Sequence, residues 1–207
     1  KFQNSVVLAV SATLLSALVG SLNGYVLAKW PFRGSGLLFA LILFGMFIPY
    51  QSILIPLFQF MKSIGLYGSL FGLVLVHVIY GIPIVTLIFR NYYSEIPDEL
   101  VEAARIDGAG YLTQLFRIAL PLSVPGLVSY GIFTFLGAYN ALLWPLIVTQ
   151  SPEMRTVQLG LLAFVSEAGS DYGALMAASA FVIAPVVLGY FVAQRQFIQG
   201  IARTGLK

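Results

Sequence analysis

The sequence has no cysteine and only one histidine, His77. Without cysteine there can be no disulfide and no thiolate metal ligand, and one histidine does not make a metal centre by itself. No Gly-x-x-x-x-Gly-Lys-[Ser/Thr] phosphate loop occurs, so nothing in the sequence indicates that this chain binds ATP. No paired acids, nucleophile or metal-ligand cluster appears either. We therefore expect no metal site and no enzymatic activity in this chain.

Charged residues are also scarce. They make up 9% of the 207 residues, and 59% of the residues are hydrophobic, whereas charged residues form roughly a quarter of a soluble domain. This composition is typical of an integral membrane protein. The net charge of +3 is explained by basic residues at the membrane edges, so we expect membrane lipid as a partner and no nucleic acid.

Several long stretches contain no Asp, Glu, Lys or Arg at all: residues 2–28, 34–61, 63–89, 118–152 and 172–194. Each is longer than the ~20 apolar residues that a membrane-spanning helix needs. We predict an all-α membrane protein, a single domain over residues 1–207, in which five helices cross the membrane. These helices lie near Ser5–Ala28, Leu37–Phe60, Leu70–Phe89, Gly126–Val148 and Tyr172–Ala193.

The basic residues predict the orientation, because Lys and Arg accumulate on the cytoplasmic side. We call residues 91–122, between the third and fourth predicted spans, the polar insert. Placing it inside puts eight basic residues there: Lys29, Arg33, Arg90, Arg105, Arg117, Arg195, Arg203 and Lys207. Three remain outside: Lys1, Lys62 and Arg155. The polar insert and the C-terminus are thus predicted to be cytoplasmic.

The polar insert contains five of the eight acidic residues, all between Glu95 and Asp107. Proline suits the first turn of a helix, and acidic residues are favoured there by the helix dipole. The sequence therefore predicts a short helix from Pro97 to Asp107, ended by Gly108 and Gly110. A second helix is expected over residues 111–120, ending at Pro121.

On this short helix Leu100, Ala103, Ala104 and Asp107 share one face. The small side chains of Ala103 and Ala104 leave room for the close approach of a partner. The alternative is an ordinary interfacial loop in which Glu102 pairs with Arg105, three residues further along the helix.

The wider spacing distinguishes these two readings. Glu102-Ala103-Ala104, Gly108 and Ile118-x-Leu120-Pro121 resemble the cytoplasmic signature loop of ABC-importer permease subunits. The resemblance implies a type I ABC-importer permease fold, in which the polar insert is a coupling loop whose short helix sits in a cleft of an ATPase subunit. It implies that Glu102 is the acidic contact, Ala103 and Ala104 the close-packed face, and Gly108 the turn. Arg105 and Asp107 belong to the same predicted surface.

Other motifs resemble the second permease subunit of the maltose-type carbohydrate-uptake branch, as in maltose, glucose or trehalose importers. They are Asn4-Ser5, Ile96-Pro97-x-Glu99-Leu100, Leu120-Pro121-Leu122-Ser123 and the tail from Gly200 to Lys207. The resemblance implies one half of a heterodimeric permease that moves a sugar or oligosaccharide inward by alternating access. A separate ATPase dimer would bind ATP and Mg, and an extracellular or periplasmic protein would deliver the solute.

The same resemblance implies a location in the cytoplasmic membrane of a prokaryote. Such permeases usually have six helices, so we expect a further helix before Lys1. The outer segment, residues 149–171, would help to receive the binding protein, although its composition alone indicates only an exposed loop. The basic tail suits lipid headgroups or, as the family suggests, contact with the ATPase through Arg203 and Lys207.

Candidate residues for the solute pathway lie on the fourth predicted helix. Spacings of three and four place Phe133, Gly137, Asn140 and Trp144 on one face. Aromatic rings cover the apolar face of a sugar, and an amide meets its hydroxyls; Tyr139, and Gln51 in the second helix, complete the set. Relatives commonly carry an acidic residue where this chain has Ala141. Alternatively, Asn140 bonds another helix and Trp144 anchors the membrane interface.

Three further features leave alternatives open. Gly20 and Gly24 form a small-xxx-small pair that would let a neighbouring helix approach closely, or they are chance neighbours. Prolines such as Pro49 and Pro83 free backbone carbonyls that line a pore, or they only kink the helix. His77 has no acidic neighbour inside the membrane, which favours hydrogen-bonded packing over proton relay.

Other solutes and mechanisms are less compatible with the sequence. Glycerol phosphate would require a cation in the pathway and a polyamine would require carboxylates, and the predicted spans contain neither; a polyol remains an alternative to a sugar. Ion-coupled secondary transporters and channels usually keep ionisable residues in the membrane, and this chain has only His77 there.

Overall fold

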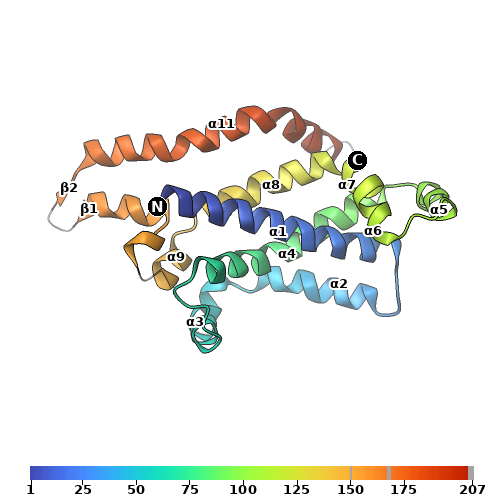
Figure 1. Cartoon of the computed structure of the whole chain (residues 1–207), viewed down its shortest axis with the longest axis horizontal. Helices are drawn as coiled ribbons and strands as arrows, with labels where there is room; N and C mark the ends of the chain where they lie inside the picture. Colours follow the sequence, from blue (N-terminus) through green and yellow to red (C-terminus); the bar gives the residue numbers. More distant parts are fainter. Residues whose placement is uncertain (150, 167–168, 205–207) are drawn as a thin grey trace. The chain divides into compact units, whose positions relative to one another are not determined.

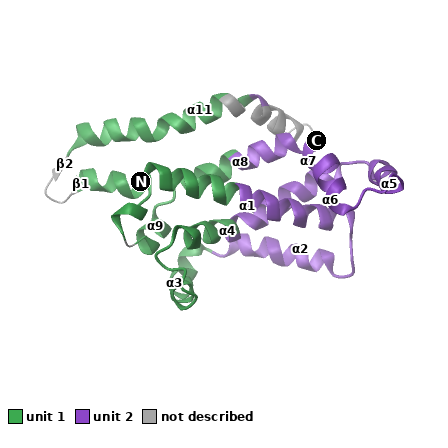
Figure 2. Ribbon diagram, in the orientation of Figure 1, with its two compact units in different colours: residues 1–13, 49–78, 132–194 green, residues 14–48, 79–131, 195–207 purple. Residues whose placement is uncertain are grey.

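The computed structural model describes the backbone of residues 1–149, 151–166 and 169–204, and the side chains of all of these except 166, 169–170, 192–193 and 196–204. The chain forms two compact units, each assembled from stretches that are separate in sequence (Figure 2). Unit 1 consists of Lys1–Thr13, Pro49–Val78 and Ile132–Gln194. Unit 2 consists of Leu14–Ile48, Ile79–Gly131 and Arg195–Lys207.

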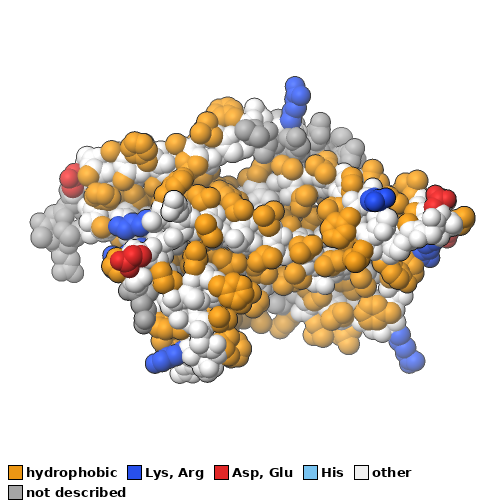
Figure 3. Space-filling view, viewed as in Figure 1, with side chains coloured by type: hydrophobic (Ala, Val, Ile, Leu, Met, Phe, Trp, Pro, Cys, Tyr) orange, Lys and Arg blue, Asp and Glu red, His pale blue; other side chains and the backbone are white. Residues whose placement is uncertain are grey.

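Most of the described chain is helical (Figure 1). By length and composition, three helical stretches can cross a membrane: α1 (Phe2–Lys29), α4 (Leu70–Ser94) and residues Tyr172–Phe191 of α11 (Tyr172–Thr204). Two interrupted helix pairs pass the same test, which raises the number of spans to five if each pair counts as one. Hydrophobic side chains cover most of the face seen in Figure 3. The prediction of an all-α membrane protein is therefore confirmed.

The prediction of a continuous second helix over Leu37–Phe60 is wrong. Helix α2 (Ser35–Phe44) and the 3-10 turn η1 (Gly45–Phe47) are followed by two extended residues, Ile48 and Pro49. The chain becomes helical again in η2 (Tyr50–Ile53) and α3 (Leu54–Ser63). Proline disfavours the helical conformation in the residue before it, which explains why the helix stops at Ile48.

The prediction of a continuous fourth helix over Gly126–Val148 is also wrong. Helix α8 (Val124–Tyr139) ends before Asn140, and a separate short helix, α9 (Leu143–Val148), begins three residues later. Pro145 has no N–H to donate to the carbonyl of Ala141, and its ring clashes with that carbonyl in a continuous helix. The sequence therefore breaks the helix at the residues that we expected to share one face.

The outer segment contains more structure than the predicted exposed loop. It comprises η4 (Pro152–Met154), α10 (Val157–Leu161), η5 (Leu162–Phe164) and two antiparallel two-residue strands, β1 (Val165–Ser166) and β2 (Gly169–Ser170). The start of α1 holds it within unit 1. Asn4 Nδ2 donates to the carbonyls of Glu153 and Arg155, at 2.6 and 3.2 Å, and the Val157 amide donates to Ser5 Oγ at 2.9 Å. The Asn4-Ser5 motif thus fixes the outer segment on α1.

In unit 2, helices α1 and α4 pack closely at Gly20 and Gly24. A Cβ atom at Gly20 would lie 2.4 Å from Val85 Cγ1, and one at Gly24 would lie 2.8 Å from the Arg90 amide nitrogen. The small-xxx-small pair is therefore a packing site. Around it lies the core of unit 2, formed by Tyr25, Val85, Phe89, Tyr93, Ile96, Leu115, Ala119 and Tyr130.

His77 takes the packing role that the sequence favours. Its Nδ1 atom lies 2.8 Å from the carbonyl oxygen of Leu73, one turn earlier in α4. This bond stays within one helix and provides no chain of proton carriers.

Replacing Gly24 by Val should destabilise unit 2, because the new side chain would collide with backbone atoms that cannot rotate away. Overpacking of this kind costs about 1–3 kcal/mol. The measurement is thermal unfolding in detergent of the protein expressed at equal level. Gly36→Ala is the matched control, because no atom lies within 4 Å of its added Cβ. Equal melting of the two variants would contradict the close approach of α1 and α4.

Candidate functional site

The polar insert contains the predicted short helix almost at its predicted bounds. Helix α5 (Asp98–Ile106) begins directly after Pro97 and carries Asp98 and Glu99 in its first turn. It ends in a turn in which the amides of Gly108 and Ala109 donate to the carbonyls of Arg105 and Ala104, both at 2.9 Å. Gly108 has a φ of +80°, a conformation that glycine adopts without strain.

The second helix of the insert extends further than predicted. It comprises α6 (Tyr111–Gln114), a π-helical turn η3 (Leu115–Ala119) and α7 (Leu120–Leu122), so Pro121 lies inside the helical stretch rather than ending it. Pro121 has no N–H to donate to the helix, and it stands two residues after the π-helical turn η3. The stretch bends by 80° into α8 at Ser123.

Helix α5 lies at the end of unit 2, beside α6 (Figure 1), and leaves most of its surface uncovered. Within α5, only Val101 is buried. Ile106 is 86% exposed and Leu100 is 47% exposed. Most of the predicted contact residues are exposed as well: Glu102, Ala103, Arg105, Asp107 and Gly108, with Ala104 half-buried.

The alternative pairing of Glu102 with Arg105 does not form. The Arg105 guanidinium instead stacks over the ring of Trp30, 3.6 Å from its centroid. Within the described part of the chain, the carboxylate of Glu102 has no ion-pair partner. Glu102 is thus an exposed, uncompensated negative charge on a helix with exposed apolar side chains.

Lys29, in the last turn of α1, holds the start of α5. Its Nζ atom donates to Asp98 Oδ1 at 2.6 Å and to the carbonyl of Ile96 at 2.5 Å. The Lys29 side chain is 5% exposed, whereas that of Asp98 is 80% exposed. The hydrogen bond and positive charge of Lys29 lower the pKa of the Asp98 carboxyl below its usual value. A lowered pKa keeps Asp98 ionised, so the pair persists at neutral pH and is lost only when the pH falls through that pKa.

Trp30, the next residue, contacts the end of α5 and the start of α6. The Arg105 guanidinium lies on its face, and the Tyr111 ring meets it edge-on with the centroids 4.3 Å apart. Cation–π contacts of this geometry are attractive because the ring face carries negative charge. One aromatic side chain, directly after α1, therefore links both helices of the insert.

A buried amide ties the turn between these helices to α1. The Tyr25 hydroxyl donates to Gln114 Oε1 at 2.9 Å, and Gln114 Nε2 donates to the carbonyl of Ala109 at 2.7 Å. Gln114 is 2% exposed, and a buried amide must be hydrogen-bonded to avoid a desolvation penalty. These two bonds satisfy one donor and one acceptor of the side chain.

Sequence reasoning did not identify Tyr25, Lys29 or Gln114 as parts of this site. Lys29 and Asp98 are 69 residues apart, and Tyr25 and Gln114 are 89 apart. No local pattern links residues at such separations. The only available signal was the polar character of Gln114 and the cation at the end of an apolar helix.

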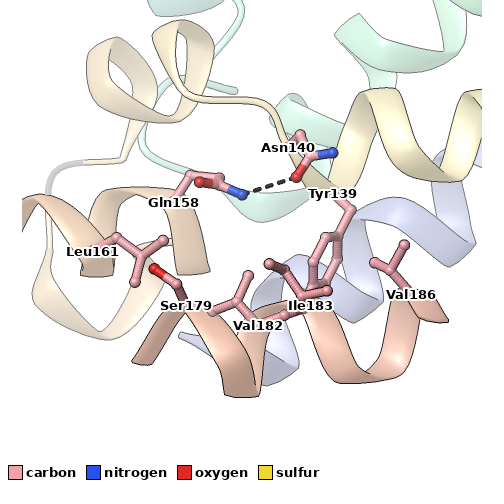
Figure 4. Close-up of a pocket in the computed structure, with 8 residues that line it drawn as sticks. All are labelled: Tyr139, Asn140, Gln158, Leu161, Ser179, Val182, Ile183 and Val186. Atoms are coloured by element: carbon pink, nitrogen blue, oxygen red, sulfur yellow. Dashed lines mark hydrogen bonds between the residues drawn. The ribbon is translucent and has the colours of Figure 1, made fainter. Parts of the chain in front are cut away.

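A second candidate site is a pocket of about 270 Å³ in unit 1 (Figure 4). Asn140 and Tyr139, at the break after α8, lie on one side of it, and Gln158 of α10 lies opposite the α11 residues Ser179, Val182, Ile183 and Val186. Gln158 Nε2 donates to Asn140 Oδ1 at 2.9 Å, and the Tyr139 hydroxyl donates to the carbonyl of Val182 at 3.0 Å. Within the described part of the chain, Asn140 Nδ2 can still donate a hydrogen bond and Gln158 Oε1 can still accept one.

The remaining candidates for the solute pathway do not line this pocket. Helix α8 ends at Tyr139 and the next helix begins at Leu143, so Trp144 does not continue the face of Phe133 and Gly137. Phe133 is 66% exposed and Trp144 is 5% exposed. Gln51 is exposed in η2. A pathway role for Phe133, Gly137, Trp144 and Gln51 stays a prediction.

The predicted contacts of the C-terminal tail with the ATPase cannot be located in the structure. Lys207 and the side chain of Arg203 lie outside the described residues. Among the residues that are described, no group of three or more His, Asp or Glu side chains could hold a metal ion.

Comparison with protein families gives a match over residues 12–203 to a family described as "Binding-protein-dependent transport system inner membrane component". An arabinooligosaccharide transport system permease of Halalkalibacterium halodurans is 36% identical over 206 residues, which cover 100% of this chain and 73% of the relative. A diacetylchitobiose uptake system permease of Streptomyces coelicolor is 34% identical and covers 98% of this chain and 68% of the relative.

Solved structures with the same fold include a bacterial ABC transporter that imports the acidic polysaccharide alginate. That chain has a TM-score of 0.78 at 24% identity, covering 95% of this chain and 75% of the other. The MetNI methionine transporter in an inward-facing conformation gives a TM-score of 0.70 at 18% identity, covering 93% and 91%. The fold is therefore that of ABC-importer permeases.

Replacing Gly108 by Val should loosen the end of α5, because a left-handed conformation costs a residue with a Cβ about 1–2 kcal/mol. Amide hydrogen exchange over Asp107–Ala109 should become faster. Gly110→Val is the matched control, because Gly110 has a φ of −71° and no atom lies within 4 Å of its added Cβ. If both variants exchanged like the wild type, the turn would not depend on glycine.

Proposed function

The chain belongs to the family of inner membrane components of binding-protein-dependent transport systems, and we propose that it is one of two homologous permease subunits of an ATP-driven sugar importer. It would form half of a heterodimeric pathway that opens alternately to the two sides of the membrane. ATP and Mg would be bound by a separate ATPase dimer, and an extracellular or periplasmic protein would deliver the solute.

The observation that carries this proposal is the exposed surface of helix α5. A polar helix that buries only Val101, keeps Ile106 86% exposed and presents an uncompensated Glu102 is suited to a protein partner. Exposed apolar and charged residues of this kind often mark interaction sites. We propose that α5 docks in the ATPase subunit through Glu102, Ala103, Ala104, Arg105 and Asp107, with Gly108 forming the turn that ends it.

The distribution of basic residues supports a cytoplasmic location for α5 and for the C-terminus. Eight of the eleven Lys and Arg residues fall on that side when α5 is inside, as expected for the cytoplasmic side of a membrane protein. We propose further that the basic tail, with Arg203 and Lys207, reaches the ATPase dimer.

A neutral sugar or oligosaccharide is the proposed solute. Relatives at 36% and 34% identity are named for arabinooligosaccharides and diacetylchitobiose. The predicted spans contain no charged side chain, which disfavours phosphorylated solutes and polyamines. Asn140 and Gln158 offer an amide donor and an amide acceptor at the pocket of unit 1, and these match the hydroxyl groups of a sugar.

The fold alone does not select the solute, because the methionine transporter MetNI shares it. A 34% identical relative from Synechocystis is named for osmoprotective compounds. A polyol-like osmoprotectant is thus the second candidate, and it would use the same amide groups.

Replacing Glu102 by Lys should uncouple the permease from its ATPase. Truncating one member of a buried interfacial charge pair costs about 2–5 kcal/mol, so co-purification of the ATPase with the tagged chain should fall by about tenfold or more. Glu99→Lys makes the same charge change one turn earlier in α5 and should have a smaller effect. Normal uptake and normal assembly of the Glu102 variant would refute the docking assignment.

Replacing Asn140 by Ala should weaken solute uptake and leave ATPase association intact. Loss of one hydrogen bond to a neutral solute costs about 0.5–1.5 kcal/mol, which predicts a several-fold rise in the solute concentration for half-maximal uptake. Arabino-oligosaccharides and diacetylchitobiose are suitable probes in proteoliposomes. Gln59→Ala, at an exposed glutamine of α3, is the control. Unchanged kinetics for Asn140→Ala with a transported probe would exclude this pocket from the pathway.

A further inference from the structure

We propose that Tyr25 and Lys29 of α1, with Trp30 directly after it, are positioning residues that make the cytoplasmic end of α1 and helix α5 move as one body. This inference rests on the proposed function, because it concerns how movement of an ATPase is passed to the membrane helices. It goes beyond the docking of α5 by identifying the helix to which α5 is attached.

Helix α5 has little packing of its own to fix its orientation. Val101 is its one buried residue, and a nine-residue helix is too short to be stable by itself. The covalent links at its two ends are Pro97 and the glycine turn at Gly108. Side-chain contacts from elsewhere must therefore hold the helix in place.

Lys29 supplies the contact at the start of α5. A lysine at the end of a membrane helix normally extends its ammonium group into water. The Lys29 side chain is instead 5% exposed, and its Nζ binds the carbonyl of Ile96 and the carboxylate of Asp98. These two acceptors flank Pro97, so one ammonium group fixes both sides of the first turn.

Trp30 and Tyr25 supply the contacts at the other end. Trp30 carries Arg105, from the last turn of α5, on its ring face and meets Tyr111 of α6 at its edge. Tyr25 reaches the carbonyl of Ala109 through Gln114. The turn after α5 is therefore tied to the same end of α1 as its first turn.

These contacts act together because they come from one short part of one helix. Tyr25, Lys29 and Trp30 lie within the last turns of α1 and the residue after it, and their partners lie before, within and after α5. Any rotation of α5 relative to α1 would have to break the ion pair, the ring contact and the Gln114 bridge at once. α1 is in turn packed on α4 at Gly20 and Gly24, so movement of α5 would reach both helices.

The first test uses spin labels, because the chain contains no native cysteine. Labels are placed at Arg33→Cys, beyond the end of α1, and Glu99→Cys, on α5; both positions are exposed. The complete transporter, with its ATPase and binding protein, is compared without nucleotide and after trapping with Mg-ATP and vanadate. We expect the same distance distribution in both states. A shift of the mean distance larger than its width would overturn the proposal.

The second test separates positioning from simple stability. In Lys29→Met with Trp30→Ala, the distance distribution should broaden, and stimulation of ATP hydrolysis by the binding protein should fall by about threefold or more. Lys29→Arg with Trp30 intact should keep normal stimulation of ATP hydrolysis, because the Arg side chain can reach the same acceptors. For the stimulation of hydrolysis, measured without labels, Arg33→Met is the control, since Arg33 is exposed and has no ion pair among the described residues.

The outcomes distinguish this inference from the proposed function. If no ATPase co-purifies with the unmodified chain, the function is wrong. If the ATPase binds but the variant with Lys29→Met and Trp30→Ala keeps a narrow distance distribution and full stimulation, only the role of α1 is wrong. If the variants fail to assemble, the trapped and nucleotide-free states of the unmodified chain still decide the matter.

Discussion

The close approach of α1 to α4 determines the arrangement of unit 2. Gly20 and Gly24 bring the two helices together so closely that a Cβ at either position would collide with α4. Because α4 leads into the polar insert, this contact brings the last turn of α1 beside the segment that precedes α5. Lys29 can then reach Asp98, and Tyr25 can reach Gln114. With larger residues at the two glycines, the helices would separate and these polar contacts would be out of reach.

The break after α8, in unit 1, also determines where polar side chains lie. Irregular backbone is tolerated at membrane depth only where protein buries it or where it lines a cavity. The break after α8 satisfies this condition, because Tyr139 and Asn140 line a pocket there and bond to Val182 and Gln158. Pro145 prevents one continuous helix here, so Asn140 lies at the break between α8 and α9. The same proline therefore explains both the broken span and the position of the amide.

The ends of α5 could be predicted from the sequence, whereas the helix breaks and the long-range polar contacts could not. Pro97 and Gly108 give the ends of α5 to within one residue, because each acts on its own backbone. Hydropathy located the spans but missed the breaks near Pro49 and Pro145, since apolar length does not report whether a helix is continuous. The Lys29–Asp98 pair was missed for another reason: its members are 69 residues apart, and only the packing of α1 on α4 brings them together.

The chemistry of α5 follows from two opposing requirements. In the proposed function, α5 must be held rigidly on α1, yet the surface that would meet the ATPase must remain free. In α5 the holding contacts are at the ends, where Asp98 and Arg105 turn toward Lys29 and Trp30. Apart from the buried Val101 and the half-buried Ala104, the other residues of α5, including Glu102 and Ile106, are exposed. Had Arg105 paired with Glu102 instead, the helix would have lost one attachment to α1 and the free charge on its outer surface at the same time.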